Sequence, residues 1–182
     1  MAVVEHLSQL LLELDNPQLG NDRRHALELQ LAQLQEQHDT GAFALQLLTT
    51  DQARLHWYAA TLLEATAKHR WAQISEGDRS TLISTLAAFL EQHFEALAPF
   101  ARSKLLVSFV TMGLQEQDGL MPGFITNVLQ WCRSSSLLGF TCLKILTEES
   151  MAAPASYQQH YLQEVRSALY SSIRHHHHVV RF

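Results

Sequence analysis

The chain has 182 residues, which is long enough for one domain with a substantial core. Its formal net charge of −5 argues against a nucleic-acid-binding protein, which needs a basic surface to displace counterions from phosphates. Glycine and proline are scarce, at 7 and 4 residues, so the leucine- and alanine-rich composition favours helix. The start of the chain lacks the basic region of a secretory signal, and no apolar run approaches the roughly 20 residues of a membrane span. We therefore expect a soluble intracellular protein.

The N-terminal half predicts a series of amphipathic helices. Residues 3–14 and 21–38 each carry leucines at the spacing of one helical face, and a break with Pro17 and Gly20 separates them. A short helix is expected after Gly41. Asp51 is a favourable N-cap residue for the next helix, whose apolar residues recur at the i, i+3, i+4, i+7 spacing of a buried face.

The C-terminal half continues this pattern. Ser75, followed three residues later by Asp78, resembles a capping box and predicts a helix that ends before Pro99. Four further helices are expected to begin at Phe100, at about Gly119, at residue 137 and at about residue 154, the first two of them forming a pair. None of these segments shows the alternation of a strand.

Short connections between helices of ordinary length place consecutive helices antiparallel. Pairing them gives units of about 30 to 45 residues, the length of HEAT and armadillo repeats. We therefore expect an all-α fold: a right-handed superhelical α-solenoid of HEAT-like antiparallel helix pairs over residues 1–174, with a histidine-rich tail at residues 175–182. Residues expected in its core include Leu62, Leu86, Phe109 and Ile145. A closed helical bundle is the alternative, because the units share no obvious sequence motif.

No catalytic signature is present. The sequence lacks GxSxG, HExxH, GxGxxG and phosphate-loop motifs, and its serines and histidines give no recognisable nucleophile, base and orienting group. Four of the eleven histidines form a run from His175 to His178, which resembles a solvated tail and not a fixed metal site. His56, His69 and His93 are isolated and expected on helix surfaces or ends. The sequence thus predicts no enzymatic activity, no cofactor and no metal site.

The cysteines and tryptophans are expected to be structural. Cys132 and Cys142 fall within apolar helical patterns and lack metal-binding spacing, so they are expected to be buried thiols. Trp57, Trp71 and Trp131 have no basic groove around them, which favours packing in the core or at helix junctions over stacking on nucleic-acid bases.

The basic residues favour one side of the expected repeats. In a solenoid, the second helices of successive pairs line one continuous surface, usually the concave one. Basic residues on these helices are the candidate partner-binding residues: Arg23, Arg54, Lys68, Arg102, Lys104 and Lys144. The same helices carry glutamates, and a surface of mixed sign suits a protein partner better than a polyanion. Ordinary solvated helix faces without a binding role are the alternative.

Three segments in the second half resemble one known family. The FARSKL segment that starts at Phe100 is similar to a helix start with the pattern F-x-R-N-K-L. The FITNVL segment from Phe124 is similar to F-x-x-N-I-L, and the LKILTEE segment ending at Glu149 is similar to L-x-x-L-x-E-E. These motifs and their order over residues 21–150 resemble the N-terminal region of the karyopherins, the nuclear transport receptors of the importin-beta superfamily. Within that family, residues 98–146 look closest to exportins of the exportin-six type.

The resemblance implies a function that the residues alone do not. It implies that the chain is the N-terminal part of a longer receptor, that its second helices bind the GTP-bound form of the small GTPase Ran, and that it shuttles between nucleus and cytoplasm. A protein cargo is also implied, with profilin-bound actin as a candidate. It implies neither a cofactor nor contact with nucleic acid or insertion into a membrane. A helical scaffold or adaptor without a GTPase partner is the second hypothesis.

Overall fold

The computed structural model describes residues 2–37, 40–115, 121–134, 136–151 and 163. Within these residues the fold is all-helical, as predicted, and contains no strand. The elements in chain order are α1 (Ala2–Leu14), α2 (Asn21–Gln37), α3 (Thr40–Leu48), α4 (Ala53–His69), the 3-10 turn η1 (Trp71–Gln73), α5 (Glu76–His93), α6 (Pro99–Gln115), α7 (Met121–Ser134) and α8 (Ser136–Met151). The helix predicted from about residue 154 and the tail at residues 175–182 lie outside the described residues.

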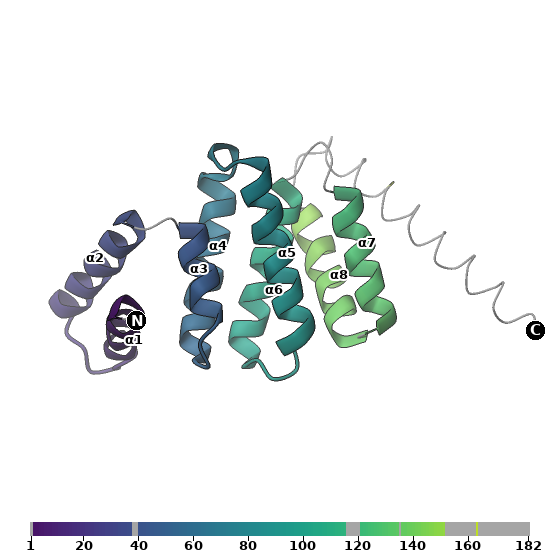
Figure 1. Ribbon diagram of the computed structural model, residues 1–182. Helices are drawn as coiled ribbons and strands as arrows, with labels where there is room; N and C mark the ends of the chain where they lie inside the picture. The colour runs from purple at the N-terminus through teal and green to yellow at the C-terminus, as the bar shows by residue number, and fades with distance from the viewer. Residues whose placement is uncertain (1, 38–39, 116–120, 135, 152–162, 164–182) are drawn as a thin grey trace, which may run out of the picture.

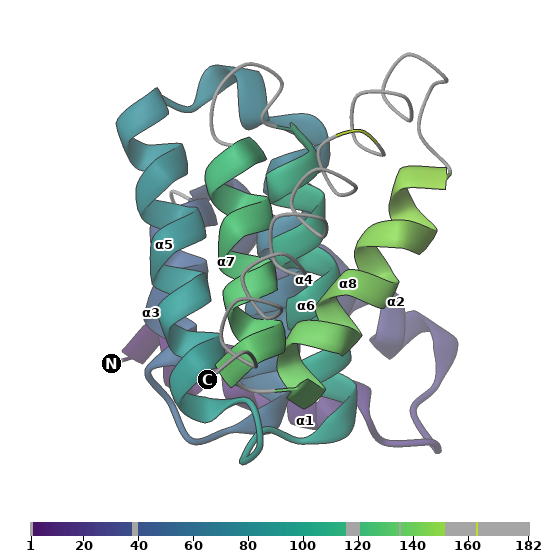
Figure 2. The same ribbon diagram turned by 90° about the vertical axis from the view of Figure 1, so that its right-hand side faces the viewer.

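The helices are arranged along the molecule in chain order. Figure 1 shows α1 and α2 at one end, followed by α3 with α4, α5 with α6, and α7 with α8 at the other end. The view in Figure 2 separates two layers, one made of α3, α5 and α7 and the other of α4, α6 and α8. Contacts run from α4 to α6 and from α6 to α8, so neighbouring helices of the second layer pack side by side. We call the outward faces of α2, α4, α6 and α8 the even-helix surface.

One detail of the predicted pairing is wrong. The sequence suggested that the helix from Phe100 pairs with the one that follows it, but α7 packs mainly against α8, and the main partner of α6 is α4. Gly139 explains this preference, because α8 crosses α7 so closely there that a Cβ on Gly139 would lie 2.2 Å from the backbone nitrogen of Cys132. The absence of a side chain at residue 139 therefore allows the two backbones to touch.

The core is built largely from leucines, with an aromatic cluster towards the C-terminal end. Leu62, Leu86 and Phe109 are buried, as predicted. Ile145 is only partly buried, because its neighbour Leu146 occupies the inward position on α8. The Phe109 ring lies 4.8 Å from the Phe124 ring and 5.0 Å from the Trp131 ring, centroid to centroid, and these tilted ring pairs join α6 to α7.

Two predicted helix starts are confirmed and one is wrong. The Ser75 hydroxyl accepts a hydrogen bond from the Asp78 backbone N–H at 3.2 Å and so caps α5. Pro99 is the first residue of α6, where its missing N–H leaves no intrahelical bond unmade. Asp51 does not cap α4: the N-cap residue is Gln52, whose side chain makes no capping hydrogen bond. The N-terminus of α4 therefore keeps free backbone donors.

Candidate protein-binding surface

All six candidate basic residues lie on the even-numbered helices. They are Arg23 on α2, Arg54 and Lys68 on α4, Arg102 and Lys104 on α6, and Lys144 on α8. The structure brings Lys68 and Lys104 together on Glu64, whereas the other four contact different residues: Arg23 contacts Glu13, Arg54 contacts Asp15, Arg102 contacts Phe94 and Lys144 contacts Glu148. Arg102 makes a cation–π contact within the chain, because its guanidinium carbon lies 5.0 Å from the centroid of the Phe94 ring.

Glu64 links the two candidate lysines on α4 and α6. Its carboxylate lies 2.5 Å from the Lys68 Nζ, one turn further along α4, and it also accepts a hydrogen bond from the Lys104 Nζ on α6. Burial acts to raise the pKa of Glu64, but the hydrogen bonds from Lys104 and Lys68 outweigh it and hold that pKa below its usual value. The hydrogen bond to Glu64 raises the pKa of Lys68. These three side chains therefore connect α4 and α6, two adjacent helices of the even-helix surface.

The two candidate arginines near the N-terminal end are also paired. The Arg23 guanidinium binds both oxygens of Glu13, with Nε–Oε1 at 2.7 Å and Nη2–Oε2 at 2.8 Å, which ties α2 to the end of α1. This hydrogen bonding lowers the pKa of Glu13. Arg54 at the start of α4 forms an ion pair with Asp15 in the α1–α2 connection. The basic residues thus join neighbouring elements and are largely neutralised by the chain's own carboxylates.

Lys144 is the most accessible of the candidates. Its side chain is 72% exposed, and its only ion pair among the described residues is a long one of 3.8 Å with Glu148, one turn further along α8. Exposed pairs of this kind contribute little to stability and exchange readily with water. Of the six residues, Lys144 is therefore the one that a partner reaches at least cost.

An apolar pocket on the even-helix surface was missed in the sequence. Trp57 was expected to pack in the core or at a helix junction; it lies where helices meet and is 40% exposed, whereas Trp71 and Trp131 are buried. Trp57 and the 53%-exposed Phe100 line a pocket of about 550 Å³ where α1, α2, α4 and the start of α6 meet. Helical spacing could have predicted the exposure of Trp57 from the sequence. Trp57 shares a face of α4 with Arg54, Thr61 and Glu64, and that face points away from the core.

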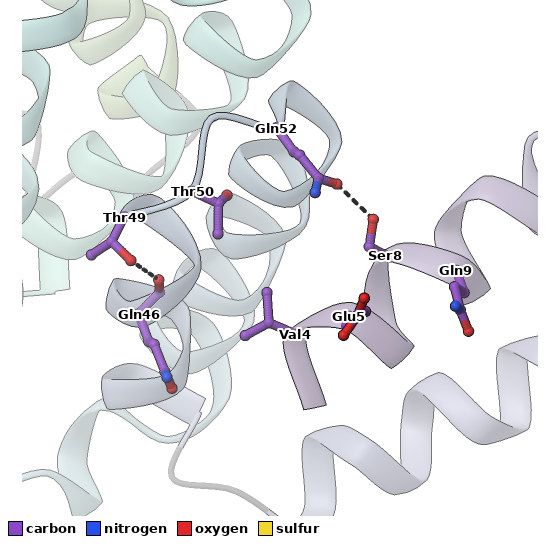
Figure 3. Close-up of a pocket in the computed structure, with 8 residues that line it drawn as sticks. All are labelled: Val4, Glu5, Ser8, Gln9, Gln46, Thr49, Thr50 and Gln52. Atoms are coloured by element: carbon purple, nitrogen blue, oxygen red, sulfur yellow. Dashed lines mark hydrogen bonds between the residues drawn. The ribbon is translucent and has the colours of Figure 1, made fainter. Parts of the chain in front are cut away.

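A second pocket, shown in Figure 3, is polar. It has a volume of about 610 Å³ and lies between α1 and the α3–α4 junction, where the Ser8 hydroxyl donates a hydrogen bond of 2.6 Å to Gln52 Oε1. The lining residues are Val4, Glu5, Ser8, Gln9, Gln46, Thr49, Thr50 and Gln52. Neither histidine nor cysteine is among them, and the lining offers hydrogen-bonding side chains and one carboxylate, that of Glu5.

The cysteines and histidines singled out in the sequence are not among the residues that line either pocket. Burial raises the pKa of the Cys142 thiol to about 12, and it also raises the pKa of Cys132, which is only partly buried. His56 was expected on the surface but is buried, with its Nε2 atom 2.6 Å from the Thr50 carbonyl oxygen. His69 and His93 are exposed, as expected. In the described part of the chain, no three His, Cys, Asp or Glu side chains gather into a potential metal site.

None of the described helices combines the length and apolar character needed to cross a lipid bilayer. No protein-family model, no curated protein and no solved structure matches the chain. A functional assignment therefore rests on the sequence resemblance and on the geometry of the even-helix surface. The three segments that carry the resemblance occupy helices: residues 100–105 near the start of α6, residues 124–129 in α7, and residues 143–149 in the second half of α8.

Proposed function

We propose that the chain is a right-handed, HEAT-like α-solenoid, the N-terminal part of an exportin-like nuclear transport receptor whose even-helix surface binds Ran-GTP. In this proposal the protein is a carrier and not an enzyme. It shuttles between nucleus and cytoplasm and contributes to the export of a protein cargo, with profilin-bound actin as a candidate. The family and the identity of these partners come from the sequence resemblance.

The observation that carries a protein-binding role is the arrangement of the even helices. α4, α6 and α8 pack side by side (Figure 2). Together with α2 they carry basic and acidic side chains and the exposed rings of Trp57 and Phe100, which line one pocket. Surfaces that mix charges of both signs with aromatic residues are typical of protein–protein contacts. The net charge of −5 makes a nucleic acid an unfavourable partner for the same surface.

The proposed mechanism is a coupling between two binding events. Ran-GTP and cargo each bind better to the same curvature of the solenoid, so each raises the affinity for the other. Hydrolysis of GTP on Ran removes the preferred partner and releases both. On binding, ion pairs within the chain such as Arg54–Asp15 and Lys144–Glu148 would be replaced by ion pairs with Ran. The binding free energy is then favourable only if Ran presents charges of both signs to this surface.

A scaffold or adaptor without a GTPase partner is the second candidate. The specific observation in its favour is the internal pairing of Arg23, Arg54, Lys68 and Lys104 with carboxylates of the same chain. A partner that used these four residues would have to break contacts that already stabilise the fold. An adaptor that binds through the apolar pocket at Trp57 and Phe100 has no such requirement.

A titration with Ran in its two nucleotide states separates the candidates. The receptor proposal predicts that Ran loaded with a non-hydrolysable GTP analogue binds at least about tenfold more tightly than Ran-GDP, within the usual range of coupling energies. Calorimetry measures both affinities under identical salt conditions. Equal affinities, or no binding of either form, would leave the adaptor as the better account.

A further inference from the structure

The pocket at the junction of α1, α2, α4 and α6 is lined by four apolar and four charged residues, and two of the apolar residues are aromatic. Leu11 is buried and Leu14 is partly buried at one side, while Trp57 and Phe100 come from adjacent helices of the even-helix surface. Exposed large apolar side chains that lie together are more informative than isolated ones. Two such rings around one hollow of about 550 Å³ make a site for a large apolar side chain.

The charged residues that line this pocket balance: two are acidic and two are basic, and one of each is paired with the other. Arg54 is neutralised by its ion pair with Asp15. Arg24 has no carboxylate partner among the described residues, and its Nη1 atom makes one long hydrogen bond of 3.5 Å to the Leu14 carbonyl oxygen. Glu28 lies one turn further along α2, with its carboxylate 4.0 Å from the Nδ1 atom of His25. Arg24 and Glu28 are therefore the lining charges that no lysine, arginine or carboxylate of the described residues neutralises.

Two helix N-termini add to the positive side of this balance. α4 starts beside the pocket without a side-chain cap, and α6 starts one residue before Phe100. Neither helix has an acidic residue in its first turn, in contrast to α5, whose first turn contains Glu76 and Asp78. Each N-terminus carries a partial positive charge of about +0.5, which favours a carboxylate over a cation near Trp57 and Phe100.

We propose that this pocket binds an acidic, hydrophobic linear segment of a protein partner. A large apolar side chain of the segment enters between Trp57 and Phe100, and a neighbouring carboxylate pairs with Arg24. Repulsion by the Glu28 carboxylate limits how many further carboxylates the segment can carry beside α2. The site depends on neither Ran nor the solenoid curvature, so it stands or falls separately from the receptor proposal.

The test uses a fluorescein-labelled hexapeptide, EDFLDE, with the full 182-residue chain. Two control peptides separate the contributions: KKFLKK reverses the charges and EDSSDE removes the apolar side chains. Fluorescence polarisation should show saturable binding of EDFLDE below about 1 mM, and at least about tenfold weaker binding of each control peptide. Trp57 is the only exposed tryptophan of the three, so saturating EDFLDE should also reduce acrylamide quenching of tryptophan fluorescence.

Matched variants locate the site. Phe100→Ala and Arg24→Glu should each weaken EDFLDE binding about tenfold, whereas Phe140→Ala and Arg133→Glu, which change the same residue types on α8 and α7, should not alter it. Glu28→Lys should tighten binding several-fold, a gain that partial unfolding does not produce. Far-UV circular dichroism and thermal melts confirm that each variant is folded.

Three results would overturn the proposal. The first is an absence of EDFLDE binding up to 1 mM, and the second is equal affinity for EDFLDE and KKFLKK. The third is a pattern in which Phe140→Ala or Arg133→Glu weakens binding as much as Phe100→Ala or Arg24→Glu. A preference of the chain for Ran-GTP over Ran-GDP would be unaffected by any of these results, so the two proposals fail independently.

Discussion

Replacing Gly139 with alanine is expected to destabilise the protein, because α8 crosses α7 at this residue. A Cβ there would lie 2.2 Å from the Cys132 backbone nitrogen and 2.5 Å from the Cys132 Cα and the Trp131 carbonyl carbon. These are backbone atoms, so one helix would have to move by roughly 1 Å to reach ordinary contact distances. The movement would loosen the packing of Leu138 and Cys142, which are buried on α8.

The expected magnitude follows from two opposing effects. Overpacking of this kind costs about 3 kcal/mol when backbone atoms must shift. Alanine regains about 1 kcal/mol through its higher helix propensity, since no described glycine requires a positive φ. The net loss is about 2 kcal/mol, or a fall in Tm of roughly 4 to 8 °C for a chain of this length. Urea denaturation followed by far-UV circular dichroism measures it.

Gly77→Ala is the matched control for this substitution. Gly77 lies in the first turn of α5, and the nearest atom to a new Cβ there is the Ser75 Oγ at 3.9 Å. Alanine at residue 77 should therefore be neutral or stabilising by up to about 1 kcal/mol. If Gly139→Ala proved as stable as the unchanged protein while Gly77→Ala behaved as expected, the close crossing of α7 and α8 would be refuted.

Three further predictions concern the core, the Glu64 contacts and the thiols. Leu62→Ala should lower the free energy of unfolding by about 2 to 5 kcal/mol, because Leu62 is fully buried between helices; a loss below 1 kcal/mol in urea denaturation would contradict that burial. Glu64→Gln should cost about 1.5 kcal/mol at pH 7. The pKa of Glu64 is lowered in the fold, so the difference in unfolding free energy between the two proteins should be complete above the unfolded pKa of about 4.3. It should disappear as the pH falls through the folded pKa. A difference that persists at pH 2 would exclude ionisation of Glu64 as its source. At pH 8, Cys132 should react with a thiol reagent in the folded protein, whereas Cys142 should react only on unfolding, because burial raises the pKa of Cys142 to about 12. Rapid labelling of the folded Cys132→Ser variant would show that Cys142 is accessible and would contradict this prediction.

Much of the fold was predictable from local sequence. The Ser75–Asp78 cap, Pro99 at the start of α6 and the leucine spacing of α4 and α5 are signals that neighbouring residues supply on their own. The preference of α7 for α8 was not predictable, because it depends on the direct approach of two backbones at Gly139. No pattern of spacing reveals that approach before the helices are placed in space.

The candidate surface was predicted less completely. The sequence placed the six basic residues on the even helices, but it gave no sign that Glu13, Asp15 and Glu64 would neutralise four of them. Three of those pairs join residues from different elements, and helical spacing reports only on neighbours within one helix; the fourth, Lys68–Glu64, is an i, i+4 pair within α4. The exposure of Trp57 escaped notice for a related reason, since its surroundings depend on where α1, α2 and α6 pack around it.

The same contacts change how the surface should be tested by mutation. Glu91 was a natural choice for a control charge reversal on an outer helix, but its carboxylate accepts a hydrogen bond from the buried Trp131 indole. Glu91→Lys would therefore disturb the packing of α5 against α7. Arg133, which is exposed in the last turn of α7, is a better control because its reversal changes charge without breaking a described contact.

The most direct measurement of the central claim is the effect of Lys144→Glu on the affinity for Ran loaded with a GTP analogue. Lys144 lies on the even-helix surface and is only loosely paired, so its reversal should leave stability unchanged within about 0.5 kcal/mol. If that surface binds Ran-GTP, Lys144→Glu should weaken binding about fivefold and Arg133→Glu on α7 should have no effect. Equal effects of the two reversals, or no effect of either on measurable Ran-GTP binding, would contradict the claim that the even helices form the binding surface.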